Sequence, residues 1–154
     1  MTAVWAGAFV LPLVGAAWWL RLRYVIVTID GASMMPAYRP GDRVLVRRTP
    51  VRAIRPGQVV VTGWPRIPGL DPAGVASLDG KWLIKRAVAV PGSPVPHRQV
   101  PALRGLPDPV VPEDRLVLLG DNAAMSHDSR QCGYFSAEDV LGVAVRRLRF
   151  AARG

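Results

Sequence analysis

Short runs of β-forming residues, separated by Gly and Pro, follow one another along the chain from residue 24 onward. Helical periodicity is largely absent from this region, and turn signals such as Pro40-Gly41, Pro56-Gly57 and Pro91-Gly92 lie between the runs. Strands this short and this closely spaced are typical of a small barrel or folded sheet. The sequence therefore predicts a mainly β domain, with strands over 24–29, 43–46, 58–62, 81–90, 115–119 and 143–148.

Two segments of the soluble region differ from this pattern. Residues 136–140 (SAEDV) predict a helical turn with Ser136 as its N-cap. Residues 92–114 are rich in proline, which cannot donate to the ladder of a central strand. We expect the second segment to be a short, irregular excursion from the β domain.

An uncharged stretch of 19 residues, from Thr2 to Leu20, precedes the β region. As a helix it nearly matches a hydrocarbon core of about 30 Å, and tryptophans lie near both of its ends. We therefore predict one transmembrane helix within residues 1–23 and a β-rich domain over 24–154. A cleaved signal peptide and a buried core helix are the alternatives, but the stretch is not preceded by a basic segment.

The composition limits the chain to one soluble domain without a disulfide. It has 154 residues, a formal charge of +9 and one cysteine, Cys132. We find no metal-ligand spacing, P-loop or dinucleotide fingerprint, and we expect no metal or cofactor. The basic excess lies in the first 55 residues, beside the predicted membrane span, which favours anionic lipid headgroups as partners over nucleic acid.

Ser33 follows the first predicted strand, in a loop flanked by Gly31 and Pro36. A hydroxyl just past a strand end is accessible on a rigid support, although a turn serine that bonds its own backbone explains the same position. Met34 and Met35 follow it directly. Exposed methionines suit a surface that meets acyl chains or an apolar peptide, so we expect both to face the substrate or the membrane.

Lys85 lies within the longest β-rich run, and it is one of only two lysines among 20 basic residues. Both faces of this strand are largely apolar, and burial there would lower the pKa of the amine from about 10.4 towards the range of a general base. An arginine would stay protonated at this position. The alternative is an edge-strand lysine whose amine reaches water.

A dense polar loop covers residues 120–133 and follows the strand predicted over 115–119. In it Asp128 and Arg130 are spaced to pair, and Ser126 can bond a neighbouring cation. His127 lies between Ser126 and Asp128, but consecutive residues point apart and do not form a Ser-His-Asp triad. We expect His127 and His97 to be exposed, and we find no pattern that would make Cys132 a nucleophile.

Taken in order, these segments resemble the type I signal peptidase family of membrane-anchored serine/lysine proteases. The resemblance rests on Ser33-Met34-Met35-Pro36, on Lys85-Arg86 with Pro91-Gly92, and on Gly120-Asp121-Asn122 through Ser126, Asp128, Ser129, Arg130 and Gly133. It covers roughly residues 24–148. Ser93 stands where many members have Asp, and the accessory region after the lysine motif is short.

The resemblance implies a Ser/Lys dyad, with Ser33 as nucleophile and Lys85 as general base. It implies further that Ser126 orients the amine, that Asp128 and Arg130 form a supporting ion pair, and that the backbone N–H of Ser33 donates to the oxyanion. The implied substrates are exported preproteins with small residues at positions −1 and −3, bound as extended strands. We expect a monomer.

Processing exported precursors would place residues 24–154 on the extracytoplasmic side of the cell membrane, with a single span before them. Arg21 and Arg23 follow the span and favour the opposite orientation by the positive-inside rule. Two other functions stay open from the sequence alone. One is a dedicated maturation protease of the same family, and the other is a non-catalytic anchored β domain that binds anionic partners.

Overall fold

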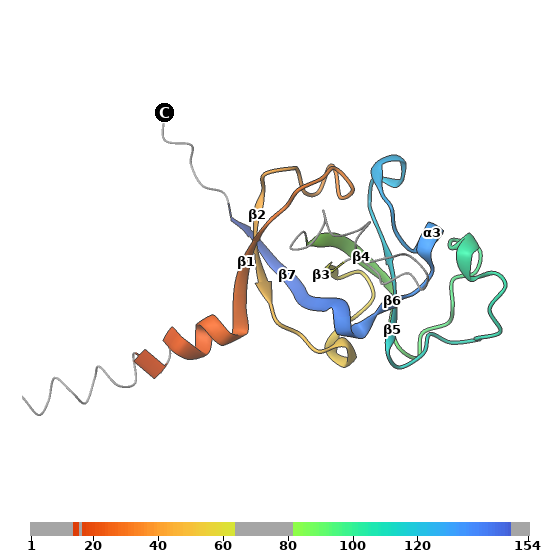
Figure 1. The fold of residues 1–154 in the computed structure, drawn as a ribbon, viewed down its shortest axis with the longest axis horizontal. Helices are drawn as coiled ribbons and strands as arrows, with labels where there is room; N and C mark the ends of the chain where they lie inside the picture. Colours follow the sequence, from red (N-terminus) through yellow and green to blue (C-terminus); the bar gives the residue numbers. More distant parts are fainter. Residues whose placement is uncertain (1–13, 16, 64–81, 149–154) are drawn as a thin grey trace, which may run out of the picture.

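The computed structural model describes residues 14–15, 17–63 and 82–148. In this part of the chain, seven antiparallel strands form one sheet (Figure 1). The sheet order is β1-β2-β7-β3-β4-β5-β6. The strands are β1 (Tyr24–Thr28), β2 (Arg43–Arg47), β3 (Val59–Thr62), β4 (Leu83–Ala89), β5 (Arg115–Leu119), β6 (Phe135–Ser136) and β7 (Val140–Leu148). The prediction of a mainly β domain is confirmed, and only the two-residue β6 lacks a counterpart among the predicted strands.

Short helical segments occupy the connections. They are η1 (Val51–Ala53), η3 (Pro101–Leu103), η4 (Ala123–Met125), α3 (Ser129–Cys132) and η5 (Ala137–Asp139). The Ser136 side chain accepts a hydrogen bond from the backbone N–H of Glu138 at the start of η5. The helical turn predicted over residues 136–140, with Ser136 as its N-cap, is therefore confirmed.

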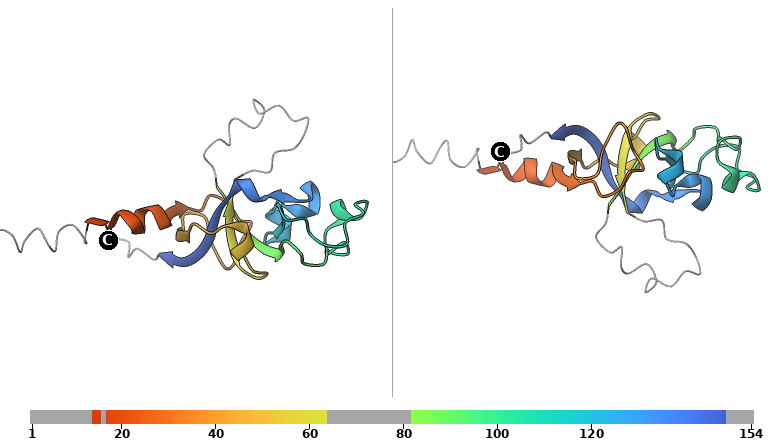
Figure 2. Two further views of the ribbon diagram at one scale, coloured as in Figure 1. Left: turned by 90° about the horizontal axis from the view of Figure 1, so that it is seen from below. Right: turned by 90° about the horizontal axis from the view of Figure 1, so that it is seen from above.

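The sheet curls into a half-barrel, which brings strands distant in the sequence side by side (Figures 1 and 2). Register shifts interrupt the β2–β7, β3–β7 and β4–β5 ladders, and such bulges bend a strand and increase its twist. Buried side chains from β1, β2, β3 and β4 form one apolar cluster, which we call the first core cluster. A second cluster is formed by buried side chains of β3, β4, β5, β6 and β7, together with Ile54.

Strand β7 is last in the sequence but lies in the middle of the sheet, between β2 and β3. Val46 of β2 pairs with Ala144, and Val60 of β3 pairs with Val143. Arg147 of β7 also reaches the loop after β1, where its Nη1 is 3.2 Å from the carbonyl of Ala37 and 3.2 Å from Asp42 Oδ2. The last strand thus holds the two halves of the sheet together.

The Pro-rich segment 92–114 is irregular, as predicted, and encloses a small core of its own. Its ends are tied by an isolated bridge between Pro94 and Val110, and η3 begins with Pro101 at its first position. Side chains from both arms of the segment are buried against β5, among them Val100, Leu103 and Val111. The excursion is therefore packed against the sheet.

Residues 14–15 and 17–23 are helical and lead directly into β1 at Tyr24. In Figures 1 and 2 this helix extends away from the sheet. Trp18 and Trp19 are exposed on it, and the guanidinium of Arg23 lies 5.1 Å from the centroid of the Trp19 ring. Most of the span predicted over residues 2–20 lies outside the described residues, among which no helix is long and apolar enough to cross a membrane.

Candidate active site

Ser33 lies in a loop whose base is closed by backbone hydrogen bonds. The N–H of Ile29 donates to the carbonyl of Asp42 at 2.8 Å, and the N–H of Gly41 donates to the carbonyl of Ile29 at 2.8 Å. A tight turn follows inside the loop, where the N–H of Met35 donates to the carbonyl of Ala32 at 3.1 Å. The loop is thus a defined support for Ser33, which is half-buried.

Met34 anchors this loop from inside the protein. Its side chain is 0% exposed and fills the first core cluster. The prediction that Met34 faces the membrane or the substrate is therefore wrong, because the residue after Ser33 points into the apolar interior. Met35 is 38% exposed.

Lys85 lies on β4 opposite Val60 of β3, and it is 2% exposed. Burial lowers the pKa of its amine, because desolvation disfavours the ammonium form; the nearby Asp128 acts in the opposite direction. The prediction that Lys85 is buried among apolar neighbours is confirmed, and the alternative of an amine in open water is excluded.

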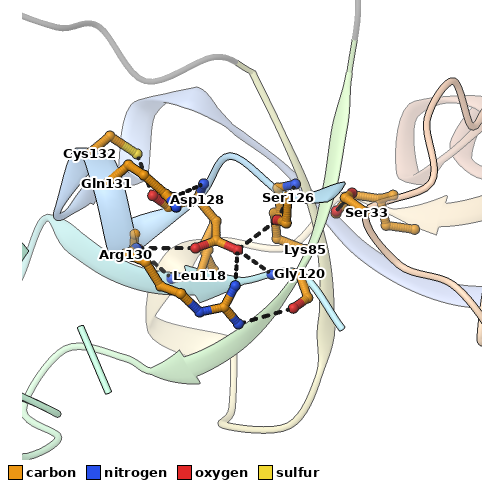
Figure 3. A network of polar contacts seen from close by, with 11 residues as sticks. Ser33, Lys85, Leu118, Gly120, Ser126, Asp128, Arg130, Gln131 and Cys132 are labelled. Atoms are coloured by element: carbon orange, nitrogen blue, oxygen red, sulfur yellow. Dashed lines mark hydrogen bonds and ion pairs between the residues drawn. The ribbon is translucent and has the colours of Figure 1, made fainter. Parts of the chain in front are cut away.

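A chain of hydrogen bonds links Lys85 to the polar loop (Figure 3). Lys85 Nζ donates to Ser126 Oγ at 3.0 Å, and Ser126 Oγ donates to Asp128 Oδ2 at 2.6 Å. Arg130 Nη1 lies 3.1 Å from the same carboxylate oxygen, so the predicted Asp128–Arg130 ion pair is present. Because the hydroxyl of Ser126 donates to Asp128, its lone pairs face Lys85.

The local fold of residues 128–132 fixes the carboxylate of Asp128. Asp128 is the N-cap of α3, where it and Gln131 form a capping box. The backbone N–H of Gly120 also donates to Asp128 Oδ2, at 2.8 Å. Ser129 ties this turn to β5, because its Oγ accepts from the buried N–H of Leu118 at 2.9 Å.

Gly120 is required by close packing at the centre of the site. A Cβ atom on this residue would lie 2.6 Å from Ser126 Cβ and 2.7 Å from the carbonyl oxygen of Ser33, and would also meet Ser126 Oγ. Any side chain here would push the Ser126 loop away from the Ser33 loop. The glycine therefore allows the two loops to meet.

The hydroxyl of Ser33 lies beside β4, at the residue that precedes Lys85. Its Oγ donates to the carbonyl of Ile84 at a long distance of 3.4 Å. A turn of this hydroxyl is needed to direct its proton to Lys85 Nζ. The structure therefore brings Ser126, Asp128 and Arg130 into one network with Lys85, and it brings Ser33 to the strand that carries the lysine.

The remaining candidate side chains lie outside this hydrogen-bond network or at its edge. His127 is exposed, as predicted, whereas His97 is half-buried with its Nδ1 2.9 Å from the carbonyl of Leu103. The thiol of Cys132 contacts the carbonyl of Asp128 at 3.0 Å, and burial raises its pKa to about 11. Within the described residues, no three His, Cys, Asp or Glu side chains gather where a metal ion could bind.

Arg86, Asp121 and Asn122 also hold the site together, and the sequence assigns them no role beyond their place in motifs. Arg86 makes a two-pronged ion pair with Asp121, with Nε–Oδ1 and Nη2–Oδ2 distances of 2.9 and 2.7 Å. Asn122 contacts the Ser33 loop through both its backbone and its side chain. The available signal was the position of Asp121 and Asn122 directly after Gly120 and that of Arg86 directly after Lys85.

The chain is similar to known proteins. The family described as "Signal peptidase, peptidase S26" matches residues 3–103 and 97–149 of the chain. A similar protein is the "Probable signal peptidase I-1" of Synechocystis sp., which is 26% identical over 162 residues. That alignment covers 87% of this chain and 77% of the relative.

Proposed function

Because the chain belongs to the peptidase S26 family of signal peptidases, we propose that it is a membrane-bound serine endopeptidase that removes N-terminal signal peptides from exported preproteins. Ser33 is the nucleophile and Lys85 the general base. The observation that carries this assignment is the Lys85 amine, which is buried and held by Ser126 on the strand that the Ser33 hydroxyl contacts.

The neutral amine of Lys85 supplies the base that a serine hydroxyl needs. Lys85 Nζ takes the proton of Ser33 Oγ while Oγ bonds to the carbonyl carbon of the substrate. As the C–N bond of the tetrahedral intermediate breaks, the lysine ammonium gives this proton to the leaving amine. Water then attacks the acyl-enzyme with Lys85 again as base, and Ser33 recovers its proton.

The other members of the network keep the amine in place and near neutrality. Ser126 offers a lone pair to Lys85 Nζ at 3.0 Å, which orients the amine. Asp128 holds Ser126, and the Arg130 guanidinium offsets part of the carboxylate's attraction for a proton on Lys85. The backbone N–H of Ser33 is the donor to the oxyanion.

The substrates we propose are precursors with small residues at positions −1 and −3, bound as extended strands. Residues 1–23 form the single membrane span, and residues 24–154 lie on the extracytoplasmic side. Exposed Trp18 and Trp19 support a helix end at a membrane interface, where tryptophan is enriched. No cofactor takes part in this mechanism.

The test is cleavage of a precursor with Ala at −3 and −1 by the full chain, by Ser33→Ala and by Lys85→Arg. Lys85→Arg keeps the positive charge but cannot be neutral, so we expect both variants to lose activity by a factor on the order of 10³ or more. Lys81→Arg makes the same change at the other lysine and should leave the rate unchanged. Undiminished cleavage by Lys85→Arg would refute the neutral-lysine mechanism.

A further inference from the structure

Asn122 bonds the carbonyls of the two peptides that flank Ser33. Its N–H donates to the carbonyl of Ser33 at 2.8 Å, and its side-chain Nδ2 donates to the carbonyl of Ala32 at 3.2 Å. The Ala32 carbonyl also accepts from Met35 N–H at 3.1 Å. Two successive carbonyls of the loop are thus held by one residue that comes 90 positions later in the chain.

These contacts fix the direction of the Ser33 N–H. The Ala32–Ser33 peptide is trans and planar, so its N–H points away from the carbonyl that Asn122 holds. Within the described part of the chain this N–H donates to no acceptor, and Ser33 is only half-buried. The N–H is therefore available to a ligand, and the Asn122 amide restricts rotation of the peptide plane that carries it.

Asn122 is itself held rigidly, because its two preceding residues are tied to other parts of the site. Asp121 is paired with Arg86 of β4, and Gly120 N–H donates to Asp128 Oδ2 at 2.8 Å. Three successive residues thus connect the Asp128 network, strand β4 and the Ser33 loop. Because these residues are tied, Asn122 can move little, and its contacts restrict the movement of Ser33.

We propose that Asn122 is a positioning residue for the reaction, and that its side-chain amide orients the Ser33 peptide so that the N–H stabilises the oxyanion. The inference rests on the function proposed above. Asn122 does not contact the substrate or Lys85 in this role. Its removal should therefore affect the transition state without changing ground-state binding or the ionisation of the base.

The first experiment compares kcat, KM and their pH dependence for the full chain and Asn122→Ala in detergent micelles, with a peptide that has Ala at −3 and −1. We expect kcat to fall about 10- to 100-fold, less than the loss of an oxyanion donor itself, with KM changed by less than about 3-fold. The pH at which activity falls on the acidic side should stay the same. Gln99→Ala truncates an exposed amide of the Pro-rich segment and should behave as the full chain does.

The second experiment uses a peptide aldehyde and the matching peptide alcohol as inhibitors. The aldehyde carbon bonds to Ser33 Oγ and gives an adduct whose oxygen occupies the oxyanion position, whereas the alcohol binds without this bond. We expect Asn122→Ala to weaken the aldehyde by the same factor as kcat/KM and to leave the alcohol unaffected. Asn122→Asp has almost the same shape but loses the donor, and should weaken the aldehyde at least as much.

The outcomes distinguish a failure of the role of Asn122 from a failure of the proposed peptidase function. Equal aldehyde affinity in the full chain and both variants would overturn the role of Asn122. So would a loss of alcohol affinity that matches the loss of aldehyde affinity, or a shifted acidic limb in Asn122→Ala. If the full chain itself neither cleaves the peptide nor binds the aldehyde more tightly than the alcohol, the proposed function fails together with the inference.

Discussion

At the scale of single residues, the amine of Lys85 lies almost entirely out of water. Lys85 is 2% exposed, and within the described residues its amine donates one side-chain hydrogen bond, to Ser126 Oγ at 3.0 Å. Asp128, one hydroxyl further away, is neutralised in part by Arg130. The buried amine therefore has a hydrogen-bond partner, but no carboxylate of the described residues contacts it directly.

The lowered pKa of Lys85 makes a prediction about stability. In the folded protein the pKa lies below its usual value of 10.5, so between these two values the unfolded chain binds a proton that the folded chain does not. The free energy of unfolding should therefore rise with pH across this window relative to Lys85→Met, by about 1.4 kcal/mol for each unit of lowering. Urea unfolding of both proteins at several pH values measures the difference between their free energies of unfolding. A difference that does not change with pH would contradict the prediction.

Gly120 should tolerate no side chain. Gly120→Ala places a methyl group against Ser126 and the Ser33 carbonyl, so we expect a loss of about 1–3 kcal/mol in the free energy of unfolding and at least a 100-fold loss of peptide cleavage. Gly105→Ala is the matched control, since a Cβ there meets no atom within 4 Å. Thermal unfolding and the peptide assay give both quantities, and equal behaviour of the two variants would show that the loops can separate.

The Cys132 thiol should react slowly with alkylating reagents. Its pKa is raised to about 11 by burial, so very little thiolate is present at pH 8. We expect iodoacetamide to modify the folded protein at least about 10-fold more slowly than the protein in denaturant. Mass spectrometry over time measures both rates, and similar rates would show that the thiol is exposed.

The role of a single residue could be predicted from the sequence where its residue type is rare in this chain or unusual for its surroundings. Lys85 stood out because arginine is the usual basic residue in this chain and because its strand is apolar on both faces. Met34 was misplaced because the pattern of a loop does not say which of two methionines turns inward. The contact of Asn122 with Ala32 depends on how two distant loops meet, which no local pattern encodes.

At the scale of elements, the segment from Gly120 to Cys132 works as one unit. Its start follows β5, its middle carries Ser126, and its end is the capped turn α3. The side chains of Asp128 and Ser129 accept hydrogen bonds from the backbone N–H groups of Gly120 and Leu118, so both side chains have partners although they are fully buried.

The link between α3 and β5 should contribute measurably to stability. Ser129→Ala leaves the buried N–H of Leu118 without its acceptor, and we expect a loss of about 1–3 kcal/mol in the free energy of unfolding. Ser136→Ala removes the cap of η5, which is partly exposed, and should cost about 1 kcal/mol or less. Chemical denaturation of both variants measures the two losses in the free energy of unfolding. A smaller loss in Ser129→Ala than in Ser136→Ala would contradict the prediction.

The strands were predictable because alternation and turn signals act within a few residues. Residues 115–119, for example, were predicted with the bounds that β5 has. Strand β6 has two residues, which is too short for any alternation to show. The position of β7 between β2 and β3 is set by packing of the whole sheet and by the register shifts in its ladders, so it could not be read from the sequence.

At the scale of the whole molecule, the proposed orientation across the membrane is open to direct measurement. We expect a reporter fused after Gly154 to be active only on the extracytoplasmic side, because exported precursors are cut there. Added protease should likewise digest the domain in spheroplasts without lysis. A cytoplasmic reporter signal would overturn the proposed localisation and would agree with Arg21 and Arg23 following the positive-inside rule.

The central place of the last strand has a consequence for when the protein can act. In the ladder of hydrogen-bonded strands, β7 lies between β2, which adjoins the Ser33 loop, and β3, which pairs with the strand that carries Lys85; its Arg147 also holds the loop at Ala37 and Asp42. Until β7 has folded into the sheet, the strand between β2 and β3 is missing, so we expect Ser33 and Lys85 not to be assembled. The proposed protease should therefore be inactive in any folding intermediate that lacks β7.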